Sequence, residues 1–192
     1  TTLPSMLKVL ADNFNVKNKD VLLFEMAKVY IPTTPDELPQ EPIRLSLGFI
    51  SSDSKKTFYT MKGYIEAVFE TVKVSDVSYK SCTTEYTFHP GRCAEIFIGD
   101  RRIGVFGEIH PEVAKTYGIS APTYIAELDM DAIFDAREKT ISYTPIPKHP
   151  AIERDLSFVC DEDTEAASVF ETIKASDKLV SEVELFDVYR GS

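Results

Sequence analysis

Apolar residues recur along the chain at two periods, one typical of helices and the other typical of strands. Spacings of three and four residues predict a helix over residues 3–14, and Pro4 suits the first turn of that helix. Apolar runs predict strands over residues 21–31 and 43–50, and the first run is apolar enough for a central position in a sheet. A second helical stripe covers residues 59–72. The chain therefore begins as helix, strand, strand and helix.

A strand, a tight turn, a returning strand and a capped helix follow in the middle of the chain. The two strands cover residues 93–98 and 103–109 and carry apolar side chains on both faces, so this sheet needs cover on both sides. Gly99 and Asp100 supply the turn, and Gly104 and Gly107 allow close approach of another element. His110 ends the strand, Pro111 suits the first turn of the helix that follows, and Gly118 can end that helix.

The end of this predicted sheet lies close to a predicted domain boundary. Residues 124–128 form another strand, and Asp129 can cap a short helix over residues 130–136. Three prolines then fall within eight residues and make a stiff, extended connector. We therefore predict one domain over residues 1–142 and a second part over residues 143–192.

The sequence of the second part predicts a β-α-β unit. It contains a strand over residues 155–160, a helix over residues 164–175 with Asp163 as its cap, and a strand over residues 183–189. So short a unit cannot bury enough apolar surface to be stable alone, and we interpret the chain as a fragment. The expected core positions of this unit are Phe158, Ala166, Val169, Phe170, Ile173, Phe186 and Tyr189.

Composition limits the classes of function. The 192 residues carry 31 acidic and 21 basic side chains and a net charge of −10, which argues against binding nucleic acid mainly through phosphate neutralisation. The three cysteines, Cys82, Cys93 and Cys160, are widely spaced and include no CxxC pair, so we expect free thiols in a reducing compartment. Without a membrane-spanning run or a signal peptide, the sequence predicts a soluble, cytoplasmic protein that does not bind membranes.

Several residue groups could carry chemistry, and each also has a structural explanation. His89, Cys93 and His110 could converge on a metal, but their spacing fits no zinc signature, and each histidine precedes a proline at a natural turn position. Cys93 could be a nucleophile, although a small apolar strand residue explains it as well. Gly104 and Gly107 resemble no phosphate loop, because they lie inside a strand and open no helix.

Two acidic groups could hold a divalent cation. Residues 161–163 are explained more simply as the turn before a helix, whose N-terminal dipole favours carboxylates. Glu127, Asp129 and Asp131 suggest magnesium, but an N-cap role for Asp129 explains the same residues. From the residues alone we assign no catalytic, cofactor-binding or metal-binding residue.

A series of motifs runs in order along nearly the whole chain, at residues 22–25, 29–30, 58–63, 88–96, 103–113, 150–159 and 185–191. They include FHPGRCAEI at residues 88–96 and RDLSFV at residues 154–159. Together these motifs resemble the β subunit of bacterial phenylalanyl-tRNA synthetase. The order and the ordinary spacing make this resemblance more specific than any single motif.

The resemblance implies an α+β fold: an antiparallel class II synthetase-like sheet flanked by helices, without catalytic activity, followed by the first half of a ferredoxin-like anticodon-binding domain. In active class II cores, an arginine near the end of a strand clamps the ATP α-phosphate, but Ile31 and Pro32 stand at that place. Glu127, Asp129 and Asp131 stand where another motif has glycines and an arginine, and they would repel triphosphate. We therefore expect both ATP-binding motifs to be absent.

The function implied by the resemblance is structural. The chain would pack beside a catalytic α subunit in an (αβ)2 enzyme that attaches phenylalanine to tRNA with ATP and Mg, while the fragment itself holds no cofactor and binds RNA weakly or not at all. One alternative is a stand-alone class II-like ligase that binds a nucleotide through Arg44, Arg92 and Glu95. Another is a free RNA-binding module that uses aromatic residues of the second part.

Overall fold

The computed structural model describes residues 1–53, 55, 57–138, 143, 145–146, 148–162 and 164–189. Two compact units make up the chain, Thr1–Ser142 and Tyr143–Ser192. None of the helices in the described parts of the chain is long and apolar enough to cross a membrane.

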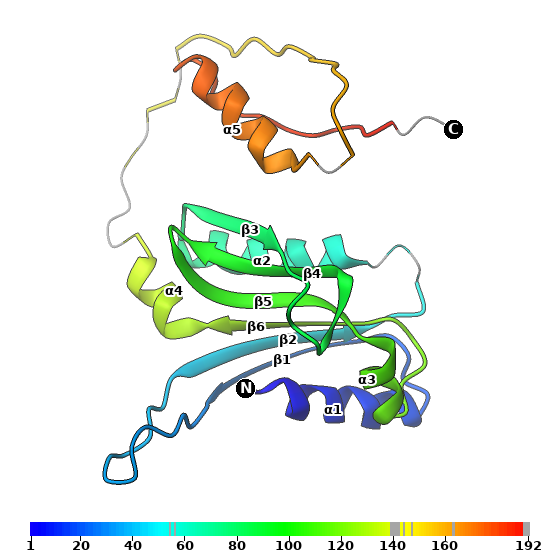
Figure 1. Cartoon of the computed structure of the whole chain (residues 1–192). Helices are drawn as coiled ribbons and strands as arrows, with labels where there is room; N and C mark the ends of the chain where they lie inside the picture. Colours follow the sequence, from blue (N-terminus) through cyan, green and yellow to red (C-terminus); the bar gives the residue numbers. More distant parts are fainter. Residues whose placement is uncertain are drawn as a thin grey trace. The chain divides into compact units, whose positions relative to one another are not determined.

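The first unit is built on a six-stranded antiparallel sheet with the strand order β1-β2-β6-β5-β4-β3 (Figure 1). Each strand pairs with its neighbours in an antiparallel register. The connection from β1 to β2 projects from the sheet, in keeping with its prolines (Figure 1). The strands are β1 (Val21–Lys28), β2 (Ile43–Ile50), β3 (Val77–Ser81), β4 (Phe88–Ile98), β5 (Arg101–Ile109) and β6 (Thr123–Asp129).

Helices cover both faces of the sheet. α1 (Leu3–Asn15) and α3 (Pro111–Thr116) contribute to the hydrophobic core on one face, which we call the α1 side. α2 (Phe58–Val72) and α4 (Met130–Ala136) contribute to the core on the other face, the α2 side. Apolar side chains on both faces of the central strands require these two layers, as the sequence predicted.

The β4–β5 hairpin follows the predicted turn chemistry. Gly99 has a φ of +55°, a conformation that glycine adopts without steric cost. At Gly107 a Cβ atom would lie 2.4 Å from the carbonyl oxygen of Arg92, so only glycine allows the two strands to approach this closely. The strands begin earlier than predicted, at Phe88 and at Arg101, because backbone pairing continues beyond the apolar runs.

β1 is an edge strand, and the prediction of a central position was wrong. It stands at one end of the strand order and pairs with β2. Leu22, Phe24 and Met26 are 55%, 76% and 58% exposed on the α2 side. α2 packs over β5 and β6 and α4 packs against β2, so neither helix reaches this row of side chains. An apolar run does not reveal whether a helix covers it.

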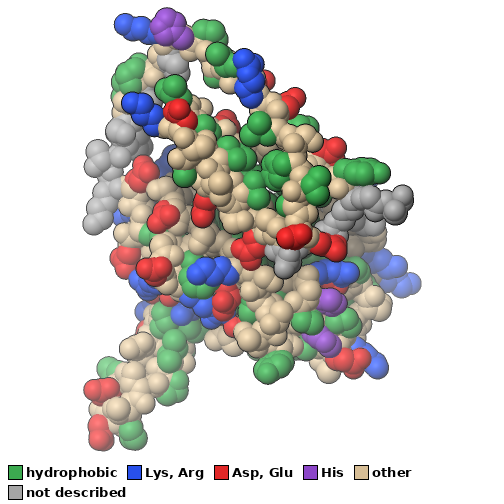
Figure 2. Space-filling view, turned by 45° about the horizontal axis from the view of Figure 1, so that its top comes forward, with side chains coloured by type: hydrophobic (Ala, Val, Ile, Leu, Met, Phe, Trp, Pro, Cys, Tyr) green, Lys and Arg blue, Asp and Glu red, His purple; other side chains and the backbone are tan. Residues whose placement is uncertain are grey.

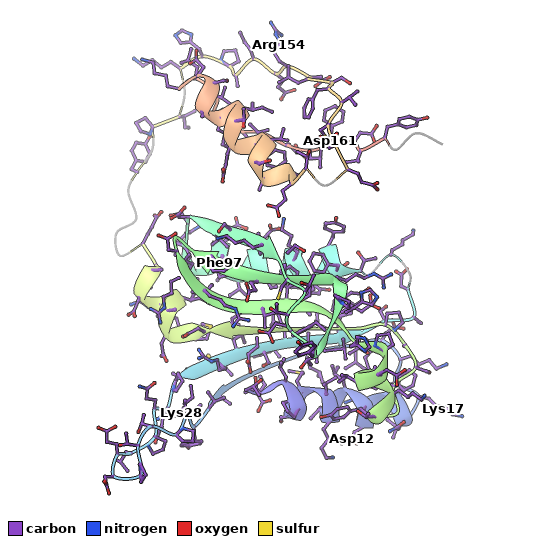
Figure 3. All side chains as sticks on the ribbon, viewed as in Figure 1. Asp12, Lys17, Lys28, Phe97, Arg154 and Asp161 are labelled. Atoms are coloured by element: carbon purple, nitrogen blue, oxygen red, sulfur yellow. The ribbon has the colours of Figure 1, made fainter. Side chains whose placement is uncertain are left out.

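The second unit contains one described helix, α5 (Ala166–Ser176), with Glu165 at its N-cap. The helix begins two residues later than predicted, and the expected cap Asp163 lies outside the described residues. The described residues of this unit form no strand, so the strands predicted over residues 155–160 and 183–189 were wrong. Arg154 and Asp161 flank the first of these segments (Figure 3). The two segments form no ladder with each other, and a strand needs a paired neighbour for its backbone groups.

The apolar side chains of the second unit are mostly open to solvent. Phe158, Phe186 and Tyr189 are 55%, 72% and 86% exposed, so their prediction as core residues was wrong. Along α5, Ala166 is exposed and the other expected core positions are half-buried. Figure 2 shows hydrophobic side chains gathered at the surface. A hollow of about 360 Å³ is lined by Leu156, Phe158, Thr164, Ser168, Val169, Thr172 and Ile173.

Candidate functional site

The α1 side of β2 and β6 brings together charged residues from the two segments that correspond to ATP-binding motifs. In the β2–β6 register Arg44 lies opposite Asp129, and Ser46 lies opposite Glu127. These pairs come from parts of the sequence more than 80 residues apart. If this fold bound a nucleotide through these segments, the side chains of Arg44, Glu127 and Asp129 would be its first candidates.

Arg44 is already neutralised by Asp129. Its Nη1 atom lies 2.7 Å from Oδ2 of Asp129, and Arg101 Nη2 lies 3.7 Å from the same oxygen. Oδ1 of Asp129 accepts the backbone N–H of Ala132 at 3.1 Å and caps α4, as the sequence predicted. Burial opposes the charge on Asp129, but the Ala132 N–H and the Arg44 guanidinium lower its pKa. A guanidinium held in this pair is not free to clamp a phosphate.

Glu127 is held by the start of the chain. Its Oε1 atom accepts hydrogen bonds from Thr1 Oγ1 at 2.9 Å, from Thr2 Oγ1 at 2.8 Å and from the Thr2 backbone N–H. The hydroxyl of Thr2 also contacts the hydroxyl of Ser46, which is fully buried. The lone pairs of Glu127 Oε1 are therefore already used in hydrogen bonds within the protein.

α1 lies directly on the sheet at this place. A Cβ atom on Gly48 would lie 2.9 Å from Cγ and Sδ of Met6 and 3.0 Å from Cδ1 of Leu10. Met6 and Leu10 are 3% and 0% exposed. Helix and strand are thus in van der Waals contact, and no ligand fits between α1 and the glycine of β2.

A separate polar network lies on the α2 side. Arg92 Nη1 pairs with Glu108 Oε2 at 2.6 Å, and the hydroxyl of Tyr124 donates to the same oxygen at 2.9 Å. Glu108 and Tyr124 are 7% and 5% exposed, whereas the Arg92 side chain is about half exposed. Burial and the Glu108 carboxylate raise the pKa of Tyr124 to about 12. The ring of Tyr124 stacks on Phe49 with centroids 4.9 Å apart, so the network is part of the core.

Arg44, Arg92 and Glu95 do not converge, so they form no nucleotide site in this structure. Glu95 pairs with Arg102, whose Nε atom lies 2.7 Å from Oε1 of Glu95. Glu95 lies opposite Val105 of the α1-side core, whereas Arg92 reaches Glu108 on the α2 side. Arg44 lies on β2, three strands away from Glu95 on β4. Each of the three side chains has its own partner.

His89, His110 and Asp131, three of the predicted metal candidates, accept hydrogen bonds from backbone N–H groups. His89 Nδ1 accepts the Gly91 N–H at 3.1 Å, and His110 Nδ1 accepts the Glu112 N–H at 3.2 Å as the N-cap of α3. Asp131 accepts the N–H of Ile43 at 2.9 Å. Within the described ranges, no group of three or more His, Cys, Asp or Glu side chains could hold a metal ion.

The sequence did not reveal two contacts between strands. One is the Arg92–Glu108–Tyr124 network, and the other is the proximity of Cys82 and Cys93. Both depend on strand pairing: the β3–β4 register places Ser81 opposite Ala94 and so brings the two cysteines together. Predicting the β3–β4 register would have revealed that the two cysteines lie close together.

Comparison with known families gives two matches along the chain. Residues 1–130 match the phenylalanyl tRNA synthetase beta chain CLM domain. Residues 147–192 match the ferredoxin-fold anticodon binding domain.

Similar proteins carry the same family name. The chain is 35% identical to the phenylalanine–tRNA ligase beta subunit of Clostridium tetani, over 100% of this chain and 24% of that protein. It is 33% identical to that of Listeria monocytogenes, over 98% of this chain and 25% of that protein. The chain therefore spans about a quarter of the length of these relatives. The resemblance inferred from the motifs is confirmed.

Solved structures share the fold at low sequence identity. The pyrrolysyl-tRNA synthetase of Desulfitobacterium hafniense matches with a TM-score of 0.57 in two structures, at 10% and 12% identity. Each match covers 74% of this chain and 54% of that chain. The predicted synthetase-like α+β fold is therefore confirmed.

Proposed function

Because the chain belongs to the phenylalanyl-tRNA synthetase β chain family, we propose that it is a non-catalytic structural module of that subunit. In the complete enzyme the module packs beside the catalytic α subunit of an (αβ)2 assembly in the cytoplasm. That assembly attaches phenylalanine to its tRNA and uses ATP and Mg for the purpose. The module itself holds neither ATP nor the metal.

The observation that carries the non-catalytic proposal is the closed α1 side of the sheet. Met6 and Leu10 of α1 pack on Gly48, where a Cβ atom would already be too close. Beside them Arg44 is paired with Asp129 at 2.7 Å. A phosphate at this place would have to displace a buried helix and break an ion pair that also caps α4, and both changes are costly.

The second unit supports a role in tRNA binding within the intact subunit, because it matches an anticodon-binding family. We propose that the isolated chain binds RNA weakly. Its net charge of −10 repels phosphates, and in this chain the aromatic rings that could stack on bases lie on segments without a sheet.

Calorimetric titration with ATP·Mg, with and without phenylalanine, tests the non-catalytic proposal. We expect no detectable heat at millimolar ligand, because the candidate side chains are already paired. Binding in the micromolar range would contradict the proposal. The variants Arg44→Gln and Arg92→Gln would then show which arginine carries the binding, since the two lie on opposite faces of the sheet.

Copurification with the α subunit tests the assembly role separately. We expect the 192-residue chain to compete with the full β subunit for the α subunit and to lower aminoacylation when it is in excess. A chain that does not bind the α subunit would contradict the assembly role. If it also does not bind ATP, the non-catalytic proposal would still stand.

A further inference from the structure

Cys82 and Cys93 lie next to each other in the first unit. The backbone N–H of Cys82 donates to the carbonyl oxygen of Cys93 at 3.0 Å, directly after the register pair Ser81–Ala94. Both side chains belong to the α1-side core, so both are on the same face of the sheet. Opposite residues that share such a bond have Cα atoms about 5.5 Å apart, which is within the range that a disulfide spans.

The two thiols differ in protonation. Burial opposes ionisation of Cys82, but hydrogen bonds from the hydroxyl and backbone N–H of Thr84 and from the N–H of Glu85 lower its pKa. The Cys82 Sγ and Thr84 Oγ1 atoms are 3.5 Å apart. Burial raises the pKa of Cys93 to about 12, and the neighbouring Cys82 adds to this effect. Cys82 is therefore the nucleophile of the pair, because the thiolate is the reactive form.

We propose that Cys82 and Cys93 form an oxidisable dithiol, a site at which peroxides reversibly join the end of β3 to β4. The Cys82 sulfur attacks one oxygen of hydrogen peroxide, so that an S–O bond forms, the O–O bond breaks and water leaves with the proton of Cys82. The Cys93 sulfur then attacks the Cys82 sulfur. An S–S bond forms, the S–O bond breaks, and the proton of Cys93 leaves with the hydroxyl group as a second water.

The surroundings of the pair fit this chemistry. Thr83 and Thr84 are exposed, so the backbone that follows Cys82 lies at the surface, although the Cys82 side chain itself is only 4% exposed. The disulfide would close the segment 83–92, which contains the register irregularity between Phe88 and Cys93. Closing this loop reduces the freedom of the unfolded chain, so oxidation is expected to raise the melting temperature.

Peptide mapping of the oxidised 192-residue chain tests the proposal. The folded chain is treated with hydrogen peroxide, the remaining thiols are alkylated under denaturing conditions, and the protein is digested with trypsin without reductant. Cleavage after Lys80, Arg92 and Arg101 should leave residues 81–92 joined to residues 93–101, and a reductant should separate the two peptides. The exposed Cys160 can link two copies, so the experiment is repeated with Cys160→Ser.

Variants separate the roles of the two sulfurs. In Cys93→Ser we expect a sulfenic acid at Cys82 that dimedone labels, whereas Cys82→Ser should leave Cys93 largely unlabelled. Equal labelling in the two variants would contradict the assigned order of attack. The peptide map of the unsubstituted chain decides the main point even if a serine variant does not fold. Recovery of Cys82 and Cys93 as separate alkylated or over-oxidised residues would overturn the proposal.

Discussion

The two compact units of the chain contain similar apolar residues but bury them to very different extents. In Thr1–Ser142, Phe88 and Phe106 are 1% and 0% exposed in the cores on the two sides of the sheet. In Tyr143–Ser192, Phe158 and Phe186 are 55% and 72% exposed. The difference lies in the number of layers: the first unit has a sheet between helices, whereas the described residues of the second form a helix and two segments that do not pair. Apolar side chains form a core only where a second layer covers them.

β1 shows that the same rule acts inside the first unit. Phe24 is 76% exposed, although its β2 partner Leu47 in the register is 9% exposed. The two residues share one face of the sheet, and the helical layer ends between them. An apolar residue therefore stabilises this chain only where a helix covers it, whichever unit it belongs to.

The largest effect is expected from deleting a covered ring. Phe106→Ala removes a fully buried ring that stacks on Phe58 with centroids 4.6 Å apart. We expect it to lower the free energy of unfolding by about 3–5 kcal/mol, from lost burial and the cavity left behind. Phe186→Ala, the matched control, should stay within about 0.5 kcal/mol, because its ring already meets water. Urea unfolding followed by circular dichroism measures both.

A loss of more than about 2 kcal/mol in Phe186→Ala would break the comparison between the units, since a typical exposed substitution costs far less. It would mean that the ring of Phe186 is covered in solution, for instance by a second copy of the chain. Dilution of the sample would then change the apparent stability of the unsubstituted protein.

A smaller effect is expected where the first unit brings two strands unusually close. Gly107→Ala would place a Cβ atom 2.4 Å from the Arg92 carbonyl oxygen and 3.0 Å from the Cys93 Cα atom. Both neighbours are backbone, so we expect a loss of about 1–3 kcal/mol from overpacking. Gly63→Ala in α2 is the control, because its Cβ atom would meet nothing within 4 Å. Alanine should stabilise that helix by about 0.5–1 kcal/mol.

Equal effects of the two glycine substitutions, measured by urea unfolding, would contradict this account. They would show that β4 and β5 can move apart at Gly107 without cost. The hairpin would then be looser than the packed sheet that distinguishes the first unit from the second.

Local signals in the sequence were sufficient for most elements of the first unit. The turn at Gly99, the N-cap at Asp129 and the helical stripe of α1 involve residues close together in the sequence, and all three are observed. Strand order is different, because it depends on contacts between distant segments. The sequence therefore did not place β1 at the edge of the sheet, nor did it predict that the described residues of the second unit would form no ladder.

The same limit applies to the candidate site. The departures from the ATP-binding motifs at Ile31 and Pro32 could be noticed from the sequence, because motifs are local. The ion pair between Arg44 and Asp129 could not, because it requires β2 to lie beside β6. Pairing across the sheet, not residue type, determines which charges in this chain are free and which are neutralised.

The smallest effect we predict compares a covered tyrosine with an exposed one. Tyr124→Phe keeps the ring on Phe49 but removes the hydroxyl that donates to Glu108 at 2.9 Å. Glu108 retains Arg92 at 2.6 Å, so we expect a loss of about 1 kcal/mol at pH 7. Tyr189→Phe should have no measurable effect, because the Tyr189 side chain is 86% exposed.

Alkaline pH should remove the advantage of Tyr124. Its pKa is raised to about 12 in the folded chain, first by burial and then by Glu108. In the unfolded chain the pKa is about 10, so the unfolded state loses the proton first as the pH rises. The stability that Tyr124 contributes is therefore complete below about pH 10 and is lost as the pH approaches 12. Urea unfolding at several pH values should show the gap between Tyr124→Phe and the unsubstituted chain closing over this interval. A gap that stays constant would mean that the hydroxyl of Tyr124 meets solvent as freely as that of Tyr189.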